Sequence, residues 1–244
     1  MSRFFLSAPL AVGDTVTLTG DDARHISYSL RMAVGDEVTL LDGVGGVFRA
    51  RLTALDGTSV QADVTEALPA EAESPLHIHL YQAYPKSDKL EFIVQKAVEL
   101  GVSEITPFES ERCIKRPKAD KLAHITERQG RIAEEAAKQC GRDRLPTVHT
   151  TVSFEEMLKQ ASRFPLCLFC YEGEGTLSMK EVCLAHPNVR EIAVVVGSEG
   201  GFSEKEAESA KKVGLCMTGL GKRILRCETA PLYVMSALSF FFEL

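Results

Sequence analysis

The sequence contains no tryptophan and no long hydrophobic run. Aromatic residues make up 7% of its 244 residues. The longest apolar stretches, such as 192–196 and 236–242, are far shorter than the roughly 18 residues of a membrane-spanning helix. Near the start, Pro9 and Asp14 interrupt the chain before the apolar core of a signal peptide accumulates. We therefore expect a soluble protein of the cytoplasm, with no membrane partner.

The cysteines form no disulfide framework. There are seven, an odd number without regular spacing, so reduced thiols are expected. Cys167 and Cys170, followed by Cys183 and His186, imitate the spacing of a zinc site. The first two, however, lie in the apolar run 166–171, which is typical of a buried strand and directs residues at an odd separation to opposite faces. We therefore predict no metal site.

The net charge of −6 is unevenly distributed. Residues 1–75 hold 5 Lys and Arg against 11 Asp and Glu, whereas the rest of the chain holds 23 of each sign. Within 111–144, ten basic residues face six acidic ones. Two interpretations stay open on charge alone: a basic face that binds phosphate, or a solvated helix face of mixed charge.

A polar segment with Pro at both ends, 69–75, predicts a linker. We place the domain boundary there, with domains at 1–72 and 73–244. The first domain has one helical pattern, at 21–32, and otherwise short alternating or β-branched runs separated by Gly-containing turns, which predict a small β-barrel. These runs are 15–19, 37–41, 47–52 and 60–64.

Strand and helix patterns alternate in the second domain, which predicts an α/β fold with a mostly parallel sheet. The predicted strands are 76–84, 104–108, 166–171, 191–196 and 215–218. A long basic helix is expected at 118–139. The expected helix starts are Ser87, Ser153, the capping box Ser203 to Glu206, and Thr229.

Two glycine-containing loops follow predicted strands. Gly197-Ser-Glu-Gly-Gly201 comes directly after 191–196, where ligands of open α/β sheets bind. It matches neither a dinucleotide fingerprint nor a phosphate-binding Walker loop, and Val196 excludes a nucleophile elbow. A structural turn is the alternative. The second loop, 219–230, follows the strand at 215–218 and carries two glycines. The two loops could enclose one ligand.

These loops carry a family resemblance. Gly197-Ser-Glu-Gly-Gly-Phe-Ser203 and Leu220-Gly-Lys-Arg-Ile-Leu-Arg-Cys-Glu-Thr-Ala230 resemble the motifs of SPOUT methyltransferases, and more narrowly those of the ribosomal RNA small-subunit methyltransferase E family. The resemblance covers nearly the whole chain. It extends to 86–101, 111–113, 137–142, 3–5, His25, Arg31 and 35–36.

The resemblance implies a SPOUT-type carboxyl-terminal domain with a deep trefoil knot and a PUA-like amino-terminal β-barrel that holds RNA. It also implies a homodimer that binds S-adenosylmethionine and methylates uridine N3 in 16S rRNA, within the small ribosomal subunit. Ser198 stands where the family more usually has Pro, and Cys227 where it often has Thr. Both replacements are conservative in size.

The site residues follow from the reaction. Backbone groups and apolar walls suit the cofactor, and the candidates are Gly197, Ser198, Glu199, Gly200, Gly201, Leu220, Gly221, Ile224 and Leu225. The uridine N3 proton must leave, so a guanidinium is needed for the developing negative charge. Arg226 is the candidate, with Glu228 or Glu199 as base or orienting carboxylate. The alternative is an Arg226–Glu228 ion pair that only fixes the loop.

Basic residues of both domains are candidates for RNA binding. They are Arg3, Arg24, Arg31, Arg112, Lys115, Arg116, Arg142 and Arg144. Two other functions remain open: methylation of a ribose 2′-hydroxyl by an enzyme of the same fold, and a non-catalytic RNA-binding assembly factor. The proton acceptor, the target nucleotide, the choice between naked rRNA and an assembled subunit, and which subunit's barrel serves which active site are also left open.

Overall fold

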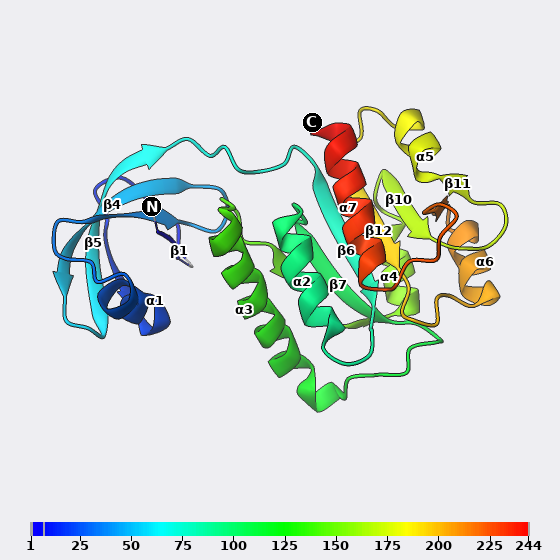
Figure 1. Ribbon diagram of the computed structural model, residues 1–244, viewed down its shortest axis with the longest axis horizontal. Coiled ribbons are helices and arrows are strands. Elements are labelled where there is room, and N and C mark those ends of the chain that lie inside the picture. The colour runs from blue at the N-terminus through cyan, green and yellow to red at the C-terminus, as the bar shows by residue number, and fades with distance from the viewer. Residues whose placement is uncertain (1, 7, 244) are drawn as a thin grey trace. The chain divides into compact units, whose positions relative to one another are not determined.

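The computed structural model describes residues 2–6 and 8–243, which form two compact units (Figure 1). The first unit comprises Met1–Glu73 together with Ala137–Leu145, and the second comprises Ser74–Ala136 with Pro146–Leu244. Residues 137–145 are distant in sequence from the rest of the first unit. The sequence-based division at 72 did not anticipate their place in that unit.

The first unit contains a five-stranded sheet in the order β1-β3-β4-β5-β2. β1 pairs with β3 in parallel, and the remaining pairs are antiparallel. The strands are β1 (Arg3–Phe5), β2 (Thr15–Thr19), β3 (Glu37–Leu41), β4 (Val47–Leu55) and β5 (Ser59–Leu68). Alternate residues of β5, Val60, Ala62 and Val64, point into the core, as the period-2 pattern predicts.

The helix predicted at 21–32 is shorter and irregular. It consists of α1 (Gly20–Arg24) and a π-helical turn, η1 (His25–Ser29). The buried side chains Ala23 and Ile26 hold it on the core, and Arg31 then adopts a left-handed φ of 53° that ends the helical path. The apolar pattern was therefore sufficient to find the helix but not its end.

The second unit is built on an eight-stranded sheet in the order β11-β13-β10-β12-β6-β7-β8, with β9 paired to β7. All pairs are parallel, which confirms the predicted α/β class. The strands are β6 (His77–Ala83), β7 (Glu104–Glu109), β8 (Thr147–Val148), β9 (Val152–Ser153), β10 (Leu166–Cys170), β11 (Leu177–Ser178), β12 (Glu191–Val196) and β13 (Cys216–Gly219).

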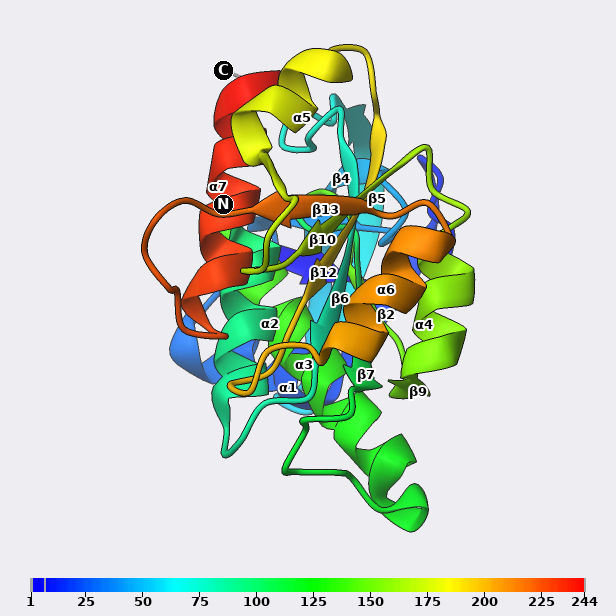
Figure 2. The ribbon, with the colours of Figure 1, turned by 90° about the vertical axis from the view of Figure 1, so that its right-hand side faces the viewer.

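Helices cover both faces of this sheet. Figure 2 shows α2 and α7 on one side of β6 and β12, and α4 and α6 on the other. Because both faces are covered, β12 is buried from Ile192 to Val196, which explains its uninterrupted apolar sequence. The helices are α2 (Lys89–Glu99), the 3₁₀ turn η2 (Ala119–Lys121), α3 (Leu122–Cys140), α4 (Phe154–Ala161), α5 (Met179–Ala185), α6 (Glu204–Lys212) and α7 (Thr229–Phe242).

Two of the four predicted helix caps are confirmed and two are wrong. Ser153 accepts a hydrogen bond from the Glu156 amide, and Ser203 forms a capping box with Glu206. Ser87 does not cap α2, because it takes a left-handed φ of 55° that carries the chain past the cap position to Asp88. Thr229 does not cap α7 either, because it is already the first helical residue.

None of the seven cysteines forms a disulfide in the structure. Across residues 2–6 and 8–243, the structure has no helix that is both long and apolar enough to span a membrane.

Candidate active site

Three loops leave the carboxyl ends of parallel strands of the second unit. One follows β6 and leads to α2, the second follows β12 and leads to α6, and the third follows β13 and leads to α7. β6 and β12 are direct neighbours in the sheet, and β10 lies between β12 and β13. Since the strands are parallel, all three loops lie at the same edge of the sheet, where ligands of α/β proteins bind.

The glycine loop, Gly197–Gly201, is folded tightly on itself. The Gly201 amide donates a hydrogen bond to the Ser198 carbonyl at 2.9 Å. A Cβ on Gly197 would lie 3.1 Å from the Cα of Gly201, and a Cβ on Gly200 would lie 2.9 Å from the Cβ of Arg112. A side chain at either position would therefore press on its neighbour, so this close packing favours glycine at both.

Buried polar atoms with no hydrogen-bond partner lie at the base of this loop. The Gln82 amide at the end of β6 donates to the Gly197 carbonyl at 3.2 Å, but its Oε1 atom has no partner. The Ser198 hydroxyl is also buried and has no hydrogen-bond partner among the described residues. Because an unpaired buried polar atom is costly, these two indicate a position where a ligand supplies hydrogen bonds.

Lys89 joins two of the loops through one ammonium group. Its Nζ lies 3.1 Å from Glu199 Oε1 in the glycine loop and 3.0 Å from Glu228 Oε2 in the loop before α7. The Lys86 backbone amide also donates to Glu199, at 3.2 Å, and the Cys227 thiol donates to Glu228 Oε2 at 3.2 Å. The two carboxylates are thus held from separate loops.

This arrangement fixes the charges at neutral pH. Burial raises the pKa of Glu199 and Glu228, but hydrogen bonds and the charge of Lys89 outweigh it and hold the pKa of both carboxyls below the ordinary value. Hydrogen bonds to Glu228 and Glu199 raise the pKa of Lys89. Burial raises the pKa of Cys227 to about 12, so its thiol keeps its proton.

The alternative pairing of Arg226 with Glu228 is wrong, because the ion-pair partner of Glu228 is Lys89. The Arg226 side chain is exposed, and its carbonyl accepts the Thr229 and Ala230 amides, each at 2.9 Å, at the start of α7. The backbone of Arg226 is therefore fixed, while its guanidinium points to solvent and can meet a substrate.

The predicted cofactor residues in the loop before α7 differ in backbone conformation and in exposure. Gly221 has a φ of 103°, which favours glycine, and Leu220 and Leu225 are half-buried. Ile224 is 81% exposed. Removing an exposed apolar side chain from water lowers the free energy. Ile224 therefore forms an apolar wall of the site only if a ligand or another chain packs on it.

A second layer of hydrogen bonds supports the glycine loop. Ser203 donates from its hydroxyl to Glu111 Oε2 at 2.6 Å, and the Glu111 amide donates to Glu206 Oε1 at 2.8 Å. The Arg112 guanidinium donates to the Gly200 carbonyl at 3.0 Å. Arg112, one of the predicted RNA contacts, is thus engaged with the glycine loop itself.

Lys115 and Arg116 line a hollow of about 360 Å³ beside the start of α2. Lys115 donates to the Ser87 carbonyl at 3.0 Å, and its ammonium group lies 5.8 Å from the centre of the Tyr84 ring. Other basic residues of the lining come from the segment before α3 and from α3 itself: Lys118, Lys121 and Arg128. Asp88 and Glu91 also line the hollow and Glu91 pairs with Arg128, but basic residues outnumber acidic ones there, which suits an anionic ligand.

The basic candidates of the first unit differ in exposure. Arg24, Arg31 and Arg144 are exposed, whereas Arg3 pairs with Asp143. Arg142 is 7% exposed and its guanidinium donates to Glu73, so it is engaged within its own unit.

Sequence reasoning missed Lys89 and Gln82. A lysine at the first position of a helix is disfavoured by the helix dipole, so Lys89 could have indicated carboxylate partners. No sequence signal pointed to Gln82, because a single Gln at the end of an apolar strand forms no recognisable functional motif.

Comparison with known proteins agrees with this arrangement. An RNA methyltransferase domain model matches residues 72–239, and an RNA methyltransferase PUA domain model matches residues 18–65. A ribosomal RNA small subunit methyltransferase E of Bacillus subtilis is 33% identical, over 100% of this chain and 98% of the relative. The chain belongs to the ribosomal RNA small subunit methyltransferase E family. This confirms the resemblance found in the sequence.

Further members of the family support the match. The Synechocystis member is 35% identical, over 99% of this chain and 78% of the relative. A crystal structure of the Neisseria gonorrhoeae member bound to S-adenosylmethionine superposes with a TM-score of 0.87 at 35% identity, covering 98% of this chain and 97% of the other. The α/β methyltransferase fold with an amino-terminal PUA domain is thereby confirmed.

Proposed function

We propose that this chain transfers the methyl group of S-adenosylmethionine to N3 of a uridine in 16S rRNA, acting on small ribosomal subunits in the cytoplasm. The observation that carries the proposal is the convergence of three loops at one edge of the parallel sheet. Lys89 links two of these loops through its ion pairs with Glu199 and Glu228. Relatives that match over the full chain are named as rRNA methyltransferases, and one was crystallised with S-adenosylmethionine.

The residues of the two glycine-containing loops fit the cofactor. The unpaired Ser198 hydroxyl and Gln82 carbonyl oxygen supply polar partners, and Gly197, Gly200 and Gly221 keep the backbone free of side chains. The residues that would hold the cofactor are Gly197, Ser198, Glu199, Gly200, Gly201, Leu220, Gly221, Ile224 and Leu225. When bound, S-adenosylmethionine supplies an electrophilic methyl group.

Arg226 stabilises the negative charge that develops on the uridine imide when N3 loses its proton. Its exposed guanidinium is anchored by a fixed backbone at the start of α7, so it can approach a substrate without moving the loop. A cation beside the imide favours the deprotonated form and makes N3 nucleophilic.

Glu228 and Glu199 act as orienting carboxylates. Hydrogen bonds and the charge of Lys89 hold both carboxylates ionised, and a general base works best with a pKa near the operating pH, far above that of these two groups. Their role is to fix the glycine loop and the loop before α7, while the N3 proton passes to solvent.

Basic residues from both units hold the rRNA. Arg24, Arg31 and Arg144 are exposed in the first unit, and Lys115 and Arg116 line the basic hollow of the second. Arg112 positions the glycine loop as well as facing RNA. Arg3 and Arg142 brace the 142–144 segment through Asp143 and Glu73, and so position the residues that contact RNA.

Two architectural features complete the proposal. The segment after β13 is threaded into a trefoil knot; β13 lies between β10 and β11, and α7 returns to pack on α2 and β12. The protein is a homodimer. Three aromatic residues of α7 with helical spacing, Tyr233, Phe240 and Phe241, are exposed, as expected of a face that meets another subunit.

The deciding experiment is methyl transfer from labelled S-adenosylmethionine to purified small subunits that lack modifications, with nucleoside analysis of the product. Wild-type protein is expected to yield N3-methyluridine. Arg226→Ala is expected to lower the rate by roughly 100-fold with cofactor affinity unchanged, because one electrostatic donor is lost.

Arg223→Ala is the matched control. Arg223 is an exposed arginine of the same loop, and its removal is expected to leave the rate within a few-fold of wild type. A 2′-O-methylated nucleoside would assign the enzyme to ribose methylation. Tight RNA binding without any transfer would instead indicate an assembly factor.

A further inference from the structure

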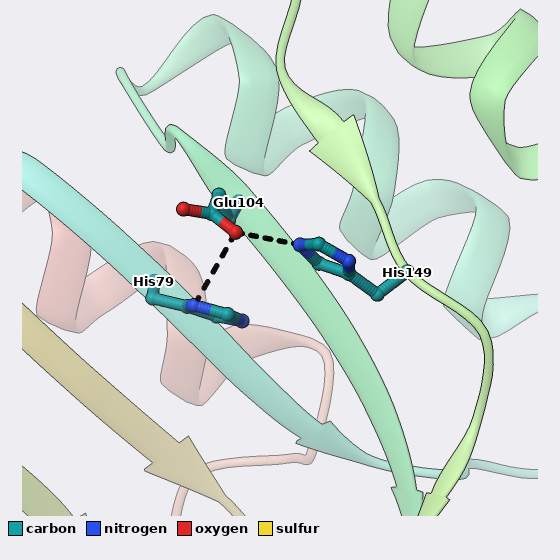
Figure 3. Close-up of side chains that lie close together, drawn as sticks. All are labelled: His79, Glu104 and His149. Carbon is teal, nitrogen blue, oxygen red and sulfur yellow. Dashed lines mark hydrogen bonds and ion pairs between the residues drawn. The ribbon is translucent and has the colours of Figure 1, made fainter. Parts of the chain in front are cut away.

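A cluster of three histidines surrounds one glutamate in the second unit, remote in the sheet from the candidate active site. His77 and His79 lie at the start of β6, Glu104 is the first residue of β7, and His149 directly follows β8. The cluster is therefore near the amino-terminal ends of β6 and β7, whereas the three loops leave the carboxyl ends of β6, β12 and β13. Figure 3 shows His79 and His149 each directed at the same oxygen of the Glu104 carboxylate.

The donor atoms lie close together. His149 Nε2 is 2.6 Å from Glu104 Oε2, His79 Nδ1 is 3.7 Å from the same oxygen, and His77 Nε2 is 3.3 Å from Oε1. One ligand atom each of His79, Glu104 and His149 lies within 4.8 Å of the others. Among residues 2–6 and 8–243, this is the one group of three or more His, Cys, Asp or Glu side chains that meets this criterion.

His79 is held in place for coordination. Its side chain is 7% exposed, and its Nε2 atom lies 2.7 Å from the Thr106 hydroxyl. When Nε2 carries the proton and donates to Thr106, the lone pair of Nδ1 faces the Glu104 carboxylate. Such a second hydrogen bond is typical of metal-binding histidines, because it fixes the tautomer and the ring orientation.

Aromatic rings wall the buried side of the cluster. The Tyr81 ring stacks on His79 with 4.2 Å between centroids, and the Phe164 ring meets it edge-on at 5.6 Å. No lysine or arginine forms an ion pair with Glu104 in the described part of the chain, so its charge is faced only by imidazoles. A cation between the carboxylate and the Nδ1 lone pair would satisfy both.

We propose that His79, Glu104 and His149 bind one divalent transition-metal ion of the zinc class. Imidazole nitrogens and a carboxylate oxygen are the ligands that Zn²⁺ and its neighbours prefer, and the fourth tetrahedral position is left to water or to His77, whose Nε2 lies 3.3 Å from Glu104 Oε1. The site lies outside the methyl-transfer machinery.

Metal binding requires the side chains to move. Two ligands of a tetrahedral zinc ion are roughly 3.4 Å apart, given metal-to-ligand distances near 2.1 Å. The 2.6 Å contact between His149 and Glu104 must therefore open slightly, and the more distant pairs must close. His77 and His149 are each partly exposed and can rotate, whereas His79 is fixed.

The ion would hold the strands at this edge of the sheet together. β8 is only two residues long, and its pairing to β7 covers two positions, so this edge is weakly held by backbone hydrogen bonds. A metal bound to side chains of β6, β7 and the end of β8 would cross-link all three. An ion that binds only the folded protein stabilises it by mass action.

The test uses the full-length protein after removal of metal with a chelator. Titration with Co²⁺ is expected to give the visible absorption of a tetrahedral site, saturating at one equivalent, and Zn²⁺ is expected to displace it. Zn²⁺ is also expected to raise the Tm. Glu104→Gln, which keeps the shape of the side chain, is expected to weaken Co²⁺ binding by at least about tenfold.

His149→Ala provides a second variant at a partly exposed position, where the fold tolerates truncation. Thr106→Val removes the hydrogen bond to His79 and is expected to weaken binding less than the loss of a ligand does. His124→Ala, at an exposed histidine of α3, is the matched control and is expected to leave binding unchanged. Binding that survives both Glu104→Gln and His149→Ala, or octahedral absorption without saturation, would overturn the proposal.

Discussion

Lys89 holds the candidate active site together at the level of a single side chain. Its ammonium group lies near 3 Å from Glu199 and from Glu228, which come from different loops. In Lys89→Met these carboxylates face each other without a cation, and their repulsion moves both loops. Because small displacements of a site lower its efficiency strongly, we expect cofactor affinity, measured by calorimetry, to fall by roughly 10- to 100-fold.

Lys86→Met is the matched control for that prediction. Lys86 has an exposed side chain, and its contact with Glu199 is made by the backbone amide, which the substitution keeps. We expect cofactor affinity near that of wild type. Equal losses in the two variants would show that general positive charge, rather than the bridge made by Lys89, supports cofactor binding.

The residues of the site differ in how far the sequence could reveal them. The glycine loop was predicted because three glycines directly after an apolar strand form a local pattern. The role of Lys89 was not, because its partners are distant in the sequence and meet it only when β6, β12 and β13 are in register. For Glu228 the sequence offered an ion pair with its near neighbour Arg226 only as an alternative, and the structure pairs Glu228 with Lys89 instead.

The element that carries the glycine loop is α6, and its first turn has more than a capping function. Ser203 accepts the Glu206 amide at 3.3 Å, as a normal cap does, and also donates to Glu111 at 2.6 Å. Ser203→Ala is expected to lower the free energy of unfolding by about 2 kcal/mol, at the upper end for a cap, and also to weaken cofactor binding. Thermal unfolding and calorimetry check both effects.

Ser178 supplies the comparison, because it forms the same capping box with Glu181 at the start of α5. Its side chain is exposed, and in the described part of the chain its hydrogen bonds stay within its own box. Ser178→Ala is expected to cost about 1 kcal/mol and to leave cofactor affinity unchanged. If both variants behaved alike, the link from Ser203 to Glu111 would not support the loop.

A second element-level contact joins the interdomain segment to the residues after α3. Glu73 accepts hydrogen bonds from the Arg142 guanidinium and from the Asp143 and Arg144 amides. Burial raises the pKa of Glu73, but these donors outweigh it and hold the pKa below the ordinary value of 4.5. Its contribution to stability is therefore fully present above pH 4.5 and is lost as the pH falls through the folded-state pKa.

Glu73→Gln tests this pH dependence. At pH 7 we expect the free energy of unfolding to fall by about 3 kcal/mol, because the charged hydrogen bonds that Glu73 makes with Arg142 and with two backbone amides are lost, and we expect the difference from wild type to shrink below pH 4.5. Denaturation is followed by circular dichroism, since the chain has no tryptophan. The control Glu66→Gln removes an exposed pair with Arg49 and should cost less than about 1 kcal/mol.

The sequence predicted the bounds of some helices and strands more accurately than others, for physical reasons. The bounds of β12 were predicted correctly because a strand buried on both faces needs an unbroken apolar run. The start of α2 was missed because Ser87 takes a left-handed conformation that its residue type does not favour, so the cap position passed to Asp88. A preference for serine at caps is weaker than the geometry imposed by the loop.

For the molecule as a whole, α3 shows that one continuous helix can belong to two structural units, which its sequence pattern does not reveal. The helix runs from Leu122 to Cys140 without a break, yet its last residues, from Ala137, belong with the first unit. Lys138 pairs with Asp22 at 2.9 Å, which ties the end of the helix to the first unit. Nothing in the periodicity of the helix marks this change of partner, because both parts carry the same amphipathic pattern.

The aromatic face of α7 leads to the prediction at the largest scale. Tyr233, Phe240 and Phe241 are exposed, and residues separated by seven or eight positions share one face of a helix. In a homodimer with two-fold symmetry, the same face of each subunit would be buried. We expect light scattering to give twice the mass of one chain for wild type, and a shift towards the monomer for Phe240→Asp, since a buried charge without a partner is costly.

Val213→Asp introduces the same charge at an exposed apolar residue just after α6 and is expected to leave the mass unchanged. A dimer that persists in Phe240→Asp would place the interface elsewhere, and a monomeric wild type would contradict the homodimer itself.

Dimer formation also bears on catalysis. If the subunit boundary along α7 reaches Ile224, whose side chain is 81% exposed, then separating the subunits uncovers an apolar wall of the cofactor site. Loss of dimer and loss of cofactor affinity would then occur together in Phe240→Asp.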